Sequence, residues 1–119
     1  MTDRRVWAQL VPTPELTTLG RTLARLEIAP DGCTLDADGH IWAADEAGRR
    51  CVRLAPGGEI VAELSMPDDL TCFACMLGGD DGRTLLMCAA PDFIVENRSA
   101  ARESVLLTTA VDVPHAGLP

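Results

Sequence analysis

The stretch IAPDGCTLDADGHIWAAD, residues 28–45, holds two Asp-Gly pairs around a short run of alternating apolar and polar residues. Alternation over residues 33–36 resumes after the second pair with the mainly apolar run 41–44. An Asp-Gly pair between two such runs favours a two-residue β-hairpin turn. We therefore predict a tight hairpin whose turn is Asp38-Gly39.

Further turn signals extend this hairpin along the chain. Glu-Ala-Gly at 46–48 precedes RRCVRLA, and Pro-Gly-Gly at 56–58 precedes EIVAELS, in which apolar residues alternate. The turns predict four short antiparallel strands within residues 33–65.

The same scheme then restarts. TCFACML is followed by the turn GGDDGR, the run TLLMCAA and, after an interruption, SVLLTTAVDV. A repeat of about 40–50 residues with four strands per unit is typical of β-propeller blades. We predict one all-β partial domain over 1–119. It has an orphan strand at 4–10, a complete blade at 30–67, and a last blade at 70–114 that lacks one strand.

Two segments depart from the β pattern. Thr13 and Pro14 suit a helix start, and leucines follow at helical spacing, so we predict a short helical insertion at 14–26. The segment PDFIVENRSAARES is expected to be a loop with one helical turn.

The charge balance excludes several kinds of partner. With 18 acidic and 10 basic residues the net charge is -8, which disfavours nucleic acid and anionic membrane surfaces. Aromatic residues make up only 3%, too few for a base-stacking platform. No apolar run reaches the roughly 18 residues of a membrane span, and we expect a soluble, cytoplasmic protein.

The five cysteines are expected to be reduced and buried. An odd number without a signal peptide suits a reducing compartment, where free cysteines behave as small hydrophobes. Cys72 and Cys75 form a C-x-x-C pair, but a spacing of three on a strand predicts side chains on opposite faces rather than a metal or redox site.

Three motifs carry a family resemblance: PDGCTLDADGHIWAAD at 30–45, CFACMLGGDDGRTLLMCAAPDF at 72–93 and VDVPHAGLP at 111–119. They resemble the sugar-lactone lactonases related to SMP-30, gluconolactonase and regucalcin. That family implies a six-bladed propeller with one divalent metal on its axis. The chain resembles only the C-terminal two-fifths or so of a member, about two blades.

The resemblance assigns one site residue. The aspartate of the family's PDG element is a metal ligand and possible general base, and that position here is Asp31. The family's other two protein ligands, a glutamate and an asparagine, have no counterpart in this chain. From the residues alone, an aspartate between Pro30 and Gly32 is more typical of a turn than of a metal ligand.

The implied reaction is hydrolysis of a small sugar lactone, in which a metal polarises the carbonyl and a carboxylate takes the proton of water. We expect Ca²⁺ first, with Zn²⁺, Mg²⁺ or Mn²⁺ as alternatives, since ligand type does not choose among them. The missing blades would come from a longer parent chain, a partner chain or a homo-oligomer. The alternative is a catalytically silent fragment that serves as a binding or assembly module.

Overall fold

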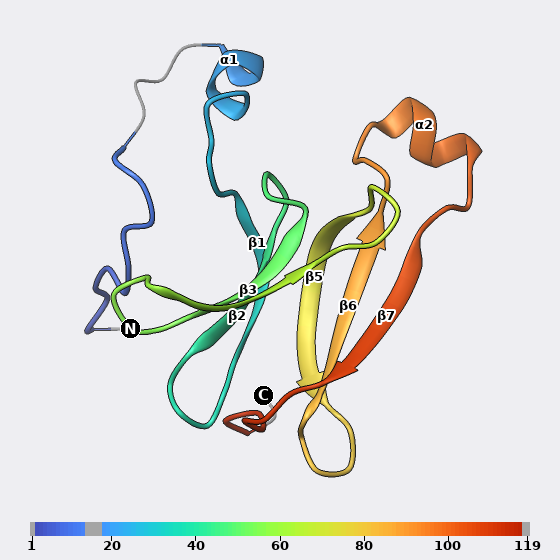
Figure 1. Cartoon of the computed structure of the whole chain (residues 1–119). Coiled ribbons are helices and arrows are strands. Elements are labelled where there is room, and N and C mark those ends of the chain that lie inside the picture. Colours follow the sequence, from blue (N-terminus) through green and yellow to red (C-terminus); the bar gives the residue numbers. More distant parts are fainter. Residues whose placement is uncertain (1, 14–17, 118–119) are drawn as a thin grey trace.

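The strands form two antiparallel sheets that stand side by side in the computed structural model, which describes residues 2–13 and 18–117 (Figure 1). Sheet 1 has the order β1-β2-β3-β4 and sheet 2 the order β5-β6-β7. The strands are β1 (Pro30–Leu35), β2 (Ile41–Asp45), β3 (Arg50–Leu54), β4 (Ile60–Ser65), β5 (Thr71–Gly78), β6 (Thr84–Ala90) and β7 (Val105–Ala110). Each strand pairs with the next along the chain, so both sheets are simple meanders.

The predicted hairpin is confirmed, but its loop has three residues, 37–39, instead of the two expected, because the Asp36 N–H pairs with the His40 carbonyl at 2.9 Å. Gly39 has φ +79°, a left-handed conformation that favours glycine, and the Gly39 N–H donates to the Asp36 carbonyl at 3.0 Å. The Asp36 carboxylate also accepts hydrogen bonds from the backbone N–H groups of Asp38 and His40, each at 3.0 Å. A side chain at the strand end thus fixes the turn that joins β1 to β2.

The helical segments are short. The helix predicted at 14–26 is observed as α1 (Leu19–Leu23), and residues 14–17 of that prediction lie outside the described residues. The single helical turn expected after β6 is α2 (Val95–Ala100). Neither has a side-chain hydrogen bond at its N-cap, so both lack a common source of helix stability.

The N-terminal segment differs from expectation. Residues 4–10 were expected to form a strand, but among them only Ala8 pairs, through an isolated parallel bridge to Gly57. A strand needs a backbone partner along its length, and in the described chain the only β-bridge of this segment is the one to the β3–β4 turn. It runs beside sheet 1 without extending it (Figure 1).

The main core lies between the two sheets. Its buried members come from β2 and β3 on one side and from β5 and β6 on the other. They are Trp42, Ala44, Cys51, Cys72, Cys75, Leu77, Leu85 and Met87. Because both sheets contribute, this main core is buried only when the two sheets pack together.

The C-terminal tail ties the lower ends of the sheets together (Figure 1). The Ala37 N–H donates to the Pro114 carbonyl at 2.8 Å, and the Ala116 N–H donates to the Leu35 carbonyl at 3.1 Å. On the other side, the His115 N–H donates to the Gly82 carbonyl at 3.0 Å. The tail therefore contacts sheet 1 and the β5–β6 loop at once.

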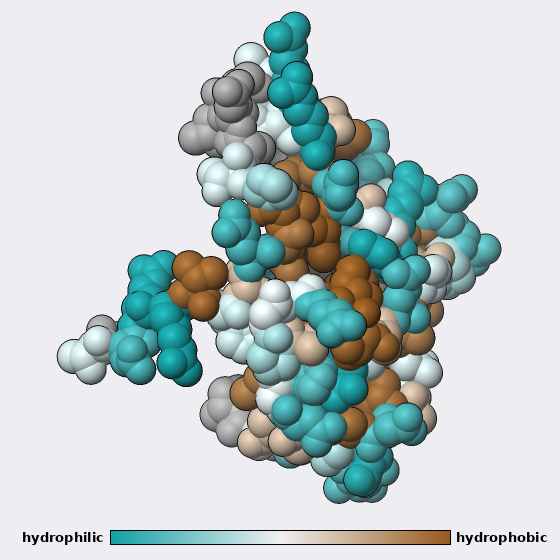
Figure 2. Space-filling model, turned by 60° about the vertical axis from the view of Figure 1, so that its left-hand side comes forward, coloured by the Kyte–Doolittle hydropathy of each residue, from teal (hydrophilic) through white to brown (hydrophobic). Residues whose placement is uncertain are grey.

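The outer face of each sheet carries apolar residues as well. On sheet 1, Leu10 and Val11 of the N-terminal segment pack on a second buried cluster that includes Val52 and Leu54. Figure 2 brings this side forward and shows apolar atoms gathered down the middle of the face, with polar atoms around them. On sheet 2, a shallow apolar pocket is lined by residues such as Phe73, and Leu106 in it is 70% exposed.

Candidate functional site

Asp31 lies on a β-bulge in the first strand of sheet 1. Pro30 pairs with Asp45 and Cys33 with Ala43, so three steps along β1 match two along β2. The extra residue bends the strand and turns side chains away from the regular alternation, as bulges beside active sites often do. Asp31 is exposed there at the edge of the sheet, in a strand and not in the turn that its neighbours also suggested.

Gly32 holds this bulge against sheet 2. A Cβ atom at position 32 would lie 2.8 Å from the Ala74 Cα and 3.2 Å from the Phe73 carbonyl oxygen. The Cys75 thiol also lies 3.5 Å from the Gly32 carbonyl oxygen. Only glycine therefore lets β1 and β5 converge this closely beside Asp31.

The second sheet repeats the same irregularity. In β5 the register shifts between Cys72 and Ala74, so Phe73 is the extra residue. Matching the two bulges by their partners in the next strand places Cys72 at the position of Asp31. Cys72 is fully buried, so the two sheets share the geometry, and only sheet 1 offers a carboxylate there.

Asp45 anchors the start of β1 from within the sheet. Its carboxylate is fully buried and accepts hydrogen bonds from the Ala29 N–H at 2.9 Å, the Gly48 N–H at 3.2 Å and the Arg50 Nε at 2.7 Å. The hydrogen bond from Arg50 to Asp45 raises the pKa of the guanidinium against the effect of burial. Sequence reasoning missed this role, although an aspartate directly before a turn is a signal for it.

Three thiols meet behind the bulge, in the core between the sheets. Cys51, Cys72 and Cys75 are all buried in one cluster, and hydrogen bonds to Cys72 and Cys75 together with burial raise the pKa of the Cys51 thiol. The hydrogen bond from Cys51 lowers the pKa of Cys72, while burial and the nearby Asp31 charge raise it. These thiols pack as small hydrophobic groups.

Two expectations about the cysteines are wrong. Cys72 and Cys75 point into the same core instead of opposite faces, because the bulge at Phe73 adds a residue to the alternation. Cys33 is exposed rather than buried, because β1 is an edge strand and Cys33 lies on the outer face of sheet 1. Cys88 is half-buried.

The carboxylates do not assemble a complete metal site within residues 2–13 and 18–117. No group of three His, Cys, Asp or Glu residues in this part of the chain could hold a metal ion. Asp36 and Asp45 are buried and paired with Arg53 and Arg50, each at 2.7 Å. Asp31 has no such ion pair among the described residues, and one carboxylate is far short of the about 6–8 oxygen ligands that Ca²⁺ takes.

None of the described helices is both long enough and apolar enough to span a bilayer.

Comparison with known proteins gives a consistent picture. Residues 1–91 match the SMP-30/Gluconolactonase/LRE-like region. A 6-deoxy-6-sulfogluconolactonase of Pseudomonas putida is 32% identical over 96 residues, which cover 76% of this chain and 31% of that protein. Regucalcin of Xenopus laevis is 35% identical over 81 residues, covering 65% of this chain and 27% of that protein.

A solved structure supports the fold. A luciferin-regenerating enzyme superposes with a TM-score of 0.56 at 23% identity, over 72% of this chain and 29% of that one. The predicted fold class, an all-β partial propeller, is confirmed by this likeness and by the two meander sheets. The chain spans about 30% of the length of the proteins it matches.

Proposed function

The chain belongs to the SMP-30/gluconolactonase/LRE-like family, and from that premise we propose that it forms the C-terminal part of a divalent-metal-dependent sugar-lactone hydrolase. One observation carries the proposal: Asp31 is exposed on a bulge where the first strands of the two sheets converge. Propeller blades are arranged around a central channel, and we infer that Asp31 lies at the side of the two sheets that faces it. Five reduced cysteines fit a cytoplasmic setting for this activity.

Asp31 contributes a carboxylate to a reaction that opens a cyclic ester. A water oxygen bonds to the carbonyl carbon, the ring C–O bond breaks, and the product is a hydroxy acid. A divalent cation, Ca²⁺ first and Zn²⁺, Mg²⁺ or Mn²⁺ as alternatives, supplies polarisation of the carbonyl when bound. Asp31 is free of any described hydrogen bond, so its oxygens are available as a cation ligand or to take the proton of water.

The site is completed by residues that this chain does not supply. Leu106 on the outer face of sheet 2 and Trp7 in the segment beside sheet 1 are exposed apolar residues that further blades would cover. Those blades belong to a longer parent chain, a partner chain or further copies of this chain. Without them we expect a lone carboxylate and no turnover.

The test completes the propeller and then removes the carboxylate. The matched third of the Pseudomonas putida relative is replaced with this chain, and hydrolysis of glucono-lactone is followed after chelation and after return of each cation. Asp31→Asn should abolish metal-dependent hydrolysis. Asp69→Asn makes the same chemical change at a 97% exposed side chain in a loop and should leave the rate unchanged.

The alternative function has its own observation. No three His, Cys, Asp or Glu residues of the described chain group into a metal site, which also fits a catalytically silent piece that serves as a binding or assembly module. A folded, metal-loaded chimera that is inactive, or one in which Asp31→Asn keeps full activity, would favour that alternative. Loss of activity in the Asp31 variant alone would support the lactonase.

A further inference from the structure

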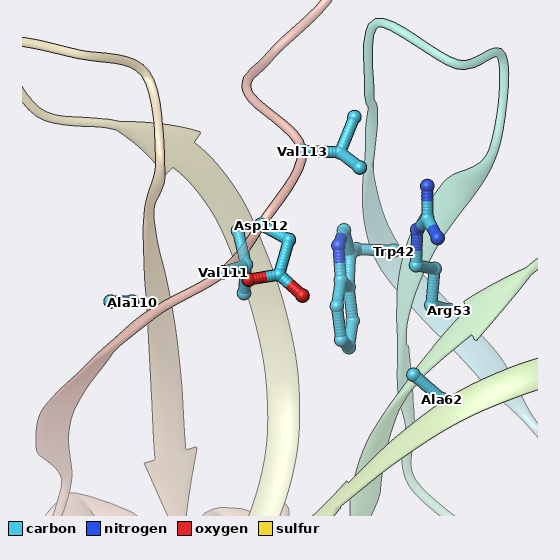
Figure 3. Close-up of a pocket in the computed structure, with 7 residues that line it drawn as sticks. All are labelled: Trp42, Arg53, Ala62, Ala110, Val111, Asp112 and Val113. Carbon is cyan, nitrogen blue, oxygen red and sulfur yellow. The ribbon is translucent and has the colours of Figure 1, made fainter.

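Away from Asp31, a cleft lies between the two sheets, at the end where β2 begins and β7 ends. It has a volume of about 230 Å³ and is lined by Trp42, Arg53, Ala62 and residues 110–113 (Figure 3). Asp31 is not among its lining residues. The cleft is built from both sheets and from the segment after β7, so the described chain forms it without further blades.

The cleft contains a buried donor without a partner. Trp42 is 4% exposed, and its indole Nε1 has no hydrogen-bond partner among the described residues. In Figure 3 the indole nitrogen lies on the ring edge that faces Asp112 and Val113. A buried donor left unpaired is destabilising, so an acceptor atom placed in the cleft would remove that penalty.

The charges around the cleft disfavour an anion as that acceptor. The Arg53 guanidinium is already paired with Asp36 at 2.7 Å and approaches Asp38 at 3.4 Å. The Asp112 carboxylate points toward the indole ring (Figure 3). The cleft is thus lined by the Asp112 carboxylate on one side of the indole and, on the other, by a guanidinium already paired with Asp36, so it offers no unpaired positive charge to an anion.

A hydroxyl group satisfies both sides of the cleft at once. Its oxygen can accept from the indole N–H of Trp42, and its proton can be donated to the carboxylate of Asp112. Because a water fills about 30 Å³, the cleft has room for a ligand of about six to eight non-hydrogen atoms. We propose that this cleft binds a small neutral polyol of the size of glycerol or erythritol, held between Trp42 Nε1 and Asp112.

The two tryptophans allow a direct test on the full chain. The chain has 2 Trp residues, so its ¹⁵N spectrum contains two indole N–H signals, and Trp7→Phe assigns them. Erythritol is titrated against the labelled protein. The Trp42 signal should shift along a saturating curve, while the Trp7 signal, from a side chain outside the cleft, should move only linearly with bulk solvent.

Variants test whether Asp112 is the second group that holds the polyol. Asp112→Asn removes the charged acceptor and should weaken erythritol binding about tenfold, as expected for loss of a hydrogen bond to a charged group. Asp80→Asn makes the same change at an exposed residue of the β5–β6 loop and should leave the affinity unchanged. Gluconate, an anion, should cause no saturating shift of the Trp42 signal at the concentrations where erythritol does.

Several results would overturn the proposal. One is a linear response of both indole signals, which would mean that the cleft holds water only. Another is equal affinity in the Asp112 and Asp80 variants, and a third is a stronger response to gluconate than to erythritol. Since no residue of the cleft is assigned to lactone hydrolysis, these results leave the proposed activity at Asp31 unaffected.

Discussion

Replacing Gly32 with alanine tests the convergence of β1 and β5 beside Asp31. The added methyl group would lie 2.8 Å from the Ala74 Cα and 3.0 Å from the Ala74 Cβ. The first of these contacts is with backbone, which cannot swing aside as a long side chain can. Overpacking of this kind typically costs about 1–3 kcal/mol, and we expect the upper part of that range because a strand must move.

Urea unfolding measures this cost. A loss of about 2–3 kcal/mol at a slope of about 1.5 kcal/mol/M lowers the unfolding midpoint by about 1.3–2 M. The matched control is Gly78→Ala, also in a strand, where an added Cβ meets no atom within 4 Å. A compatible Gly→Ala change stabilises by about 0.4–1 kcal/mol, so this variant should unfold at the same or higher urea concentration.

The comparison has a clear opposite outcome. If Gly32→Ala and Gly78→Ala have the same midpoint, the two strands do not converge at Gly32 as the structure has them.

A second, independent expectation concerns the site. In the completed propeller, Gly32→Ala should also lower the lactone hydrolysis rate, since the bulge that presents Asp31 has to shift.

Other predictions address the buried charges, the thiols and the α2 loop. Asp36→Asn leaves Arg53 without its 2.7 Å partner and should cost about 2–4 kcal/mol in urea unfolding, against less than about 0.5 for Asp38→Asn; equal losses would contradict the buried pair. A thiol reagent should label exposed Cys33 in the native chain long before Cys51, whose pKa is raised by thiol hydrogen bonds and burial; mass spectrometry giving equal rates would refute this. The hydrogen bond from the Ile94 N–H lowers the pKa of the Asp92 carboxyl below its usual 3.8. The ionised Asp92 therefore supports α2 fully above pH 3.8, and this support is lost as the pH falls through the lowered pKa. An NMR titration that gives Asp92 a pKa above 3.8 would disprove it.

The sequence by itself determined the strands, the turns and the family. The hairpin at Asp38-Gly39 and the loop GGDDGR depend on residues that are adjacent in the chain, so their conformations follow from local preferences. The PDG element made Asp31 a candidate ligand only through the family resemblance, and that role stays a prediction. Two meander sheets could therefore be predicted before any contact between them was known.

Only the tertiary structure decided how side chains are directed and paired. The bulge at Phe73 turns Cys72 and Cys75 into one core, and the outer face of an edge strand exposes Cys33. Asp36 binds Arg53 across 17 residues of chain, and Gly32 meets Ala74 of the other sheet. Such features depend on which strands become neighbours, and a bulge of one residue reverses every face that alternation predicts.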